Sequence, residues 1–96
     1  MNSSAVQVLC DVHCRPGSVP PRYRIFVQGE LFAERTWIWA NHYLEECLQI
    51  LAPPGQYDIC FEFIDPSQTA KFKVKNPRIA EGWAEIDSNL RLTILP

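Results

Sequence analysis

Apolar and polar residues alternate most regularly between positions 56 and 63. The apolar side chains Tyr57, Ile59, Phe61 and Phe63 recur at every second residue, with mostly polar residues between them. A period of two places these side chains on one face of a strand. A Pro-Pro-Gly segment before the run and an Asp-Pro-Ser segment after it favour turns. This stretch therefore predicts a half-buried β-strand.

A second alternating run follows the turn, with apolar residues and three lysines at positions 70–75. If Phe61 faces Phe72 in an antiparallel pair, Glu62 faces Lys71 on the other side of the same pair. Opposite charges at facing positions contribute roughly 0.2–1 kcal/mol each. The two runs therefore predict a hairpin, in this register or in one displaced by two residues.

Other stretches also have the pattern of short strands. Gly29 can adopt positive φ, so a tight hairpin is expected at Gly29-Glu30. The first predicted strand is expected at a sheet edge or against a neighbouring subunit. The predicted strands cover residues 5–10, 23–27, 31–39 and 90–95.

Residues 41–51 admit two interpretations. Leucines three or four residues apart would line one stripe of a helix capped by Asn41, and the local pattern favours this helix. In a strand, alternate apolar side chains would face inward, but Glu46 would fall among them. The sequence leaves the choice between a short helix and a strand open.

Six or seven short one-sided strands predict an all-β protein, because packing two sheets face to face buries their apolar sides. The expected fold is a small antiparallel β-sandwich. Its 96 residues make one core, with residues 1–21 as an N-terminal strand and Pro-rich arm, and residues 22–96 as the sandwich domain.

The composition narrows the possible partners. A formal net charge of −2 disfavours a nucleic-acid partner, and the three lysines are explained as the solvated face of a strand. No stretch of about 18 apolar residues is present, so a membrane partner is not expected. The chain lacks the pattern of a secretory signal, which predicts a cytoplasmic protein with reduced thiols.

The segment from Cys10 to Cys14, with His13 inside it, carries residue types that bind zinc. A closed zinc site takes four ligands, often as two close pairs, whereas Cys47 and Cys60 are isolated. No metal and no cofactor are therefore expected. A cysteine nucleophile with a histidine base would need a thiol of lowered pKa, which sequence spacing does not establish.

Aromatic residues are the best candidates for a recognition surface, because tryptophan and tyrosine can stack on sugars or anchor protein interfaces. Trp37 and Trp39 are two residues apart, so one face of a strand could present both. Arg35 is expected to be solvated at the rim of such a surface. The candidate binding residues are Arg35, Trp37, Trp39 and Trp83.

The order of motifs resembles that of jelly-roll modules that bind carbohydrate: Tyr-x-Ile-x-Val-x-Gly at 23–29, the tryptophan pair, and Pro-Gly-x-Tyr-x-Ile-x-Phe at 54–61. Residues 29–37 look like a pattern in small uncharacterised proteins of tailed phages, particularly those that infect cyanobacteria. The resemblance implies a jelly-roll-like sandwich in which residues 41–51 form a strand. The Asp-rich calcium loop of several sugar-binding modules is not matched at residues 65–68.

These observations favour a non-enzymatic interaction or assembly module that binds protein and forms a homo-oligomer. The resemblance implies a phage structural or accessory protein, placed in the host cytoplasm or the virion. The first alternative is a carbohydrate-binding module that uses Trp37 and Trp39. The second is a small cysteine-dependent enzyme.

Overall fold

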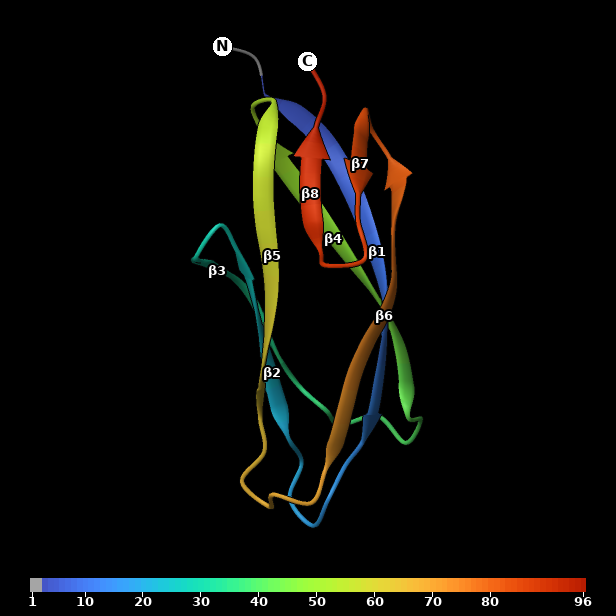
Figure 1. Ribbon diagram of the computed structural model, residues 1–96. Coiled ribbons are helices and arrows are strands. Elements are labelled where there is room, and N and C mark those ends of the chain that lie inside the picture. The colour runs from blue at the N-terminus through green and yellow to red at the C-terminus, as the bar shows by residue number, and fades with distance from the viewer. Residues whose placement is uncertain (1–2) are drawn as a thin grey trace.

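The computed structural model describes residues 3–96, which form two antiparallel sheets packed face to face (Figure 1). The predicted all-β class and antiparallel sandwich are confirmed. One sheet has the strand order β4-β1-β6, and the other has the order β3-β2-β5-β8-β7. The strands are β1 (Ser4–Arg15), β2 (Arg22–Val27), β3 (Glu30–Thr36), β4 (Tyr43–Ala52), β5 (Gly55–Ile64), β6 (Lys71–Glu81), β7 (Ala84–Ile86) and β8 (Arg91–Ile94).

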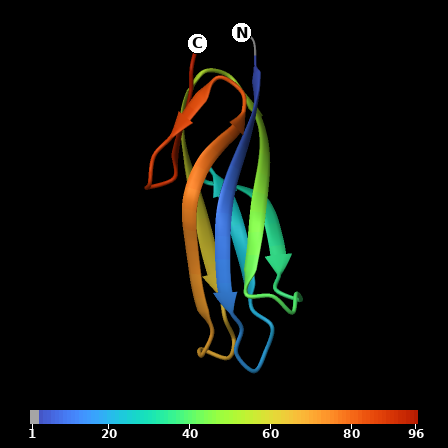
Figure 2. The ribbon, with the colours of Figure 1, turned by 90° about the vertical axis from the view of Figure 1, so that its right-hand side faces the viewer.

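β1 is the central strand of the three-stranded sheet, with β4 on one side and β6 on the other (Figure 2). Every second side chain from Val6 to Cys14 is buried between the two sheets. The prediction that this strand lies at an edge or reaches another subunit is therefore wrong. Residues 4–15 belong to the core and are not an arm outside a domain of residues 22–96.

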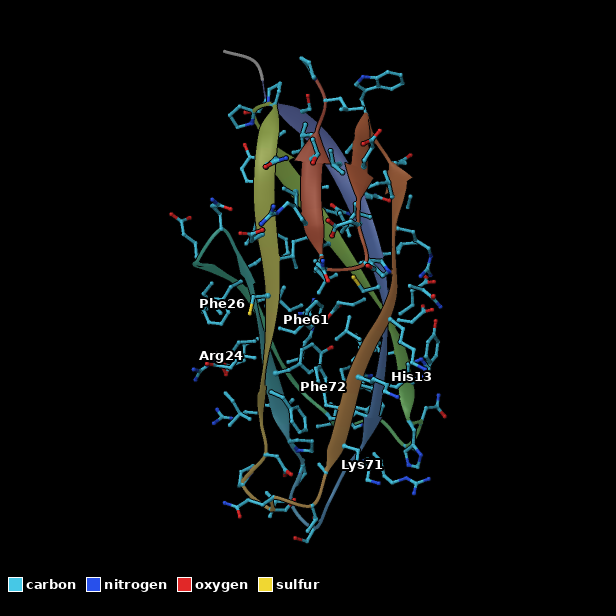
Figure 3. The ribbon with its side chains drawn as sticks, in the orientation of Figure 1. His13, Arg24, Phe26, Phe61, Lys71 and Phe72 are labelled. Atoms are coloured by element: carbon cyan, nitrogen blue, oxygen red, sulfur yellow. The ribbon has the colours of Figure 1, made fainter. Side chains whose placement is uncertain are left out.

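β5 and β6 lie in opposite sheets, so the predicted hairpin between them is wrong. β5 pairs with β2 and β8, whereas β6 pairs with β1. Phe61 and Phe72 do approach each other, but across the core, with ring centroids 6.4 Å apart (Figure 3). Phe63 stacks on Phe72 at 4.6 Å. Alternation identifies the core-facing side of a strand but not its hydrogen-bonded neighbour.

Residues 43–52 form strand β4, so the helix interpretation is wrong. β4 pairs with β1 in an unbroken antiparallel register from Tyr43 opposite His13 to Ala52 opposite Ser4. Leu48 and Ile50 point into the core, and Glu46 points inward with them. The strand is stable with a carboxylate inside because that carboxylate is fully hydrogen-bonded, as described below.

Strand boundaries also differ from those expected. The β2–β3 hairpin turns at Gln28 and Gly29, which both have positive φ, one residue before the predicted position. β3 ends at Thr36, so Trp37 and Trp39 lie in the connection to β4 and not in a strand. Within residues 3–96, no helix is long and apolar enough to cross a membrane.

Candidate interaction surface

Large apolar side chains are exposed mainly on one flank of the sandwich. Among residues 3–96, eight such side chains are exposed, and six of them belong to β3, β4 and the connection between these two edge strands. We call these six residues the apolar flank. The apolar flank consists of Leu31, Phe32, Ile38, Trp39, Tyr43 and Leu51.

One end of the apolar flank is hollowed. An open depression of about 390 Å³ lies between the β2–β3 hairpin and the end of β4. Leu31 and Phe32 line it from β3, and Leu51 lines it from β4. Most of its other lining side chains are also apolar, so the depression can accept an apolar side chain from a partner.

The buried carboxylate of Glu46 joins β4 to the other sheet. Glu46 is only 4% exposed. Its Oε1 accepts hydrogen bonds from Tyr23 Oη at 2.9 Å and from Arg35 Nε at 3.0 Å, and its Oε2 accepts one from Arg35 Nη2 at 3.3 Å. These contacts fasten the edge strand β4 to β2 and β3 across the sandwich.

The pKa shifts of Tyr23 and Arg35 agree with their hydrogen bonds to Glu46. Burial, followed by the charge of Glu46, raises the pKa of the Tyr23 hydroxyl, so Tyr23 stays a hydrogen-bond donor. The hydrogen bond to Glu46 raises the pKa of Arg35. Arg35 therefore forms a partly buried ion pair with Glu46, while 39% of its side chain stays exposed to solvent, as the sequence predicts. In the sequence, Glu46 falls at an inward-facing position of the strand pattern. This position indicates a basic partner, because a buried carboxylate requires one.

The tryptophan pair is divided between core and surface. Trp37 is 2% exposed, and its Nε1 donates to the carbonyl oxygen of Asn41 at 3.1 Å. Trp39 is 38% exposed and meets Trp37 edge to face, with ring centroids 5.2 Å apart. Only Trp39 of this pair can offer a ring face to a ligand. Trp83 is exposed in the β6–β7 turn, apart from the apolar flank.

The buried thiols Cys10 and Cys14 are poor candidates for a catalytic nucleophile. Cys10 and Cys14 point into the core, where burial raises the pKa of Cys10 to about 11 and also raises that of Cys14. His13 lies on the outer face of the same strand, with its ring centroid 5.2 Å from that of Tyr43 (Figure 3). His13, Cys14 and His42 line a common depression of about 270 Å³, but burial keeps the thiol protonated and hence a poor nucleophile.

No cluster of three or more His, Cys, Asp or Glu side chains suited to a metal ion occurs in the described part of the chain. The Cys10 to Cys14 segment does not form such a cluster because the alternation of β1 directs the two thiols inward and His13 outward.

Comparison with known proteins finds no matching family model, no matching curated protein and no matching solved structure.

Proposed function

We propose that this protein is a non-enzymatic interaction and assembly module that acts through protein–protein contacts made by the apolar flank. One observation carries the proposal: six of the eight exposed large apolar side chains belong to the edge strands β3 and β4 and to the connection between them. Monomeric proteins rarely expose large contiguous apolar patches, and such patches mark interaction sites.

The residue types of the apolar flank suit a protein partner. Trp39 and Tyr43 are the kinds of side chain that supply most of the binding energy in protein interfaces. Glu30 is exposed beside the apolar side chains of β3 and would form part of a polar rim. The proposed partner is a protein, and self-association is the expected form of assembly.

The setting that we propose is a phage particle or a phage-encoded assembly, as the sequence resemblance implies. Neighbouring genes for capsid and tail proteins would support this setting. Neighbouring genes for glycoside hydrolases would favour the carbohydrate-binding alternative instead.

Sedimentation velocity over a range of concentrations tests the proposed function. The wild-type protein should sediment as its 11.0 kDa monomer when dilute and as a larger species when concentrated. Leu51→Lys should weaken the association by at least about tenfold, since burying one leucine contributes roughly 1.5–3 kcal/mol. Leu51 is 72% exposed, so the substitution should not disturb folding.

Trp83→Ser is the matched control, because Trp83 is 70% exposed but lies outside the apolar flank. This variant should associate like the wild type. A protein that stays monomeric at every concentration would contradict the proposal, and so would equal effects of Leu51→Lys and Trp83→Ser.

A further inference from the structure

The free edge of β4 is the least protected sheet edge in the described structure. β3, β4, β6 and β7 lie at sheet edges. β7 has only three residues, and β3 carries an irregularity opposite Ile25 and Phe26. β6 has three lysines, Pro77, a positive φ at Asn76 and shifts in its register with β1. β4 has ten residues in unbroken register, without proline, glycine or lysine. Its two charged residues are both paired within the chain, the inward-pointing Glu46 with Arg35 and Glu45 with Arg78, so neither charge is left free at the edge.

The register of β4 with β1 shows which backbone groups are free. The Cys14 N–H donates to the carbonyl oxygen of His42 at 2.9 Å, and this pair continues the β1–β4 register. Antiparallel hydrogen bonding alternates along a strand, so even-numbered residues of β4 point their backbone groups toward β1. The N–H and C=O groups of the odd-numbered residues point outward, toward the free edge. These residues are Tyr43, Glu45, Cys47, Gln49 and Leu51.

We propose that β4 pairs antiparallel with β4 of a second copy of this chain, about a two-fold axis at Cys47. The inference rests on the proposed function and specifies its partner. In this register Cys47 faces Cys47 of the other copy, Glu45 faces Gln49, and Tyr43 faces Leu51. The two three-stranded sheets then join into one continuous six-stranded sheet.

The two halves of the apolar flank are complementary under this symmetry. Ile38 and Trp39 precede the start of β4, where Tyr43 lies. Leu31 and Phe32 lie beside the end of β4, where the depression of about 390 Å³ opens. A two-fold axis at the middle of the strand brings the start of one β4 against the end of the other, so each half of the flank covers the other half.

The cross-strand side-chain pairs favour the same register. The axis at Cys47 places no like charges directly opposite each other, and it pairs Tyr43 with Leu51 twice. Moving the axis to Leu48 would place Glu45 opposite Leu51 and would lose both apolar pairs. Cross-strand partners contribute directly to pairing, so the Cys47-centred register is preferred.

The size of the interface sets the expected affinity. The ten residues of β4 and four flanking side chains give about fourteen residues per copy, compared with roughly 20–30 in a standard interface. About ten backbone hydrogen bonds would form, which is a usual number for an interface. At roughly 30 Å² per residue the interface buries about 840 Å² in total, which is in the range of weak and transient association. We therefore expect a dimer with a dissociation constant in the micromolar range.

Disulfide trapping tests the pairing. Facing residues in a hydrogen-bonded antiparallel pair have Cα atoms about 5.5 Å apart, which is within the range of a disulfide. Wild-type protein, Cys47→Ser and Cys60→Ser are each oxidised with copper–phenanthroline and run on a non-reducing gel. The exposed Cys60 is the matched control, because it lies on the other sheet.

A linked dimer should form in wild-type protein and Cys60→Ser, and it should fall at least tenfold in Cys47→Ser. Equal linkage in Cys47→Ser would overturn the pairing. If sedimentation shows a dimer but Cys47 does not link, the copies associate elsewhere, and the proposed function survives without this edge pairing. If the protein is monomeric by sedimentation at all concentrations, the proposed function and this inference both fail.

Discussion

The partly buried ion pair of Arg35 and Glu46 allows a direct test of how β4 is held in the sandwich. Arg35→Met keeps most of the side-chain volume but removes both donors, which leaves the buried carboxylate of Glu46 with the Tyr23 hydroxyl as its partner. Removing one member of a buried ion pair costs about 3–5 kcal/mol. The Arg35 side chain is 39% exposed, so water reaches the site, and we expect the lower cost of about 2–3 kcal/mol.

Urea and thermal unfolding, followed by circular dichroism, measure this cost. A loss of about 2–3 kcal/mol in a domain of this size lowers the midpoint of thermal unfolding by roughly 10–20 °C. Arg24→Met is the matched control. Its side chain is 38% exposed and points away from the sandwich (Figure 3), and its partners Glu34 and Glu62 have side chains that are 36% and 52% exposed. Surface pairs of this kind contribute about 0–1 kcal/mol.

The double variant Arg35→Met/Glu46→Leu separates the loss of the pair from the burial of an unpaired charge. Replacing both members of a buried ion pair with apolar residues is often neutral, so the double variant should be more stable than Arg35→Met alone. If Arg35→Met and Arg24→Met cost the same, or if the double variant is no more stable than Arg35→Met, the account of Glu46 as a buried and paired carboxylate is refuted.

Three further predictions concern other parts of the fold. The hydrogen bond from the Ser67 hydroxyl lowers the pKa of Asp65, so Asp65 stabilises the fold above the unfolded pKa of about 3.9 and loses this effect as the pH falls through its lower folded pKa. In Asp65→Asn, the free energy of unfolding measured with urea should therefore fall less steeply with decreasing pH than in the wild type. An unchanged slope would contradict this. Gly82→Ala should lower the free energy of unfolding by about 2 kcal/mol or more in thermal unfolding, because φ is +103° and the added Cβ would lie 2.6 Å from a backbone oxygen of β1. The control Gly29→Ala should cost less, because Gly29 has a positive φ but open space around it. Iodoacetamide labelling read by mass spectrometry should modify two thiols rapidly and spare the buried Cys10 and Cys14 until unfolding, and rapid labelling of either buried thiol would refute their placement.

The sequence predicted the fold class because one-sided alternation is a local property. The alternating residues of β5 and of β8 lie in strands near the expected positions. Strand partners were not predictable in the same way. Phe61 and Phe72 meet, but the same alternation is compatible with a hairpin and with contact across two packed sheets. The charge pairing of Glu62 with Lys71 did not distinguish these arrangements.

The local pattern of residues 41–51 favours a helix because an inward-facing Glu46 is unfavourable in a strand unless it has hydrogen-bond partners. The cost of burying the Glu46 carboxylate is offset by hydrogen bonds from Tyr23 and Arg35, which are 23 and 11 residues away. The local sequence pattern does not predict such distant contacts. Trp37 and Trp39 were expected to share one face of a strand, but β3 ends before them and the chain crosses between the sheets there. The sequence therefore identified aromatic residues near the candidate surface, whereas the grouping of the apolar flank required the topology.

Amide hydrogen exchange in β4, measured by NMR at a low and a high protein concentration, tests the central claim most directly. In dilute solution, amides at even positions from 44 to 50 should be protected by β1, and those at odd positions from 45 to 51 should exchange rapidly. At high concentration the odd-numbered amides should become at least about tenfold slower as the second copy pairs with the edge. Exchange at the odd positions that stays rapid at both concentrations would contradict the account.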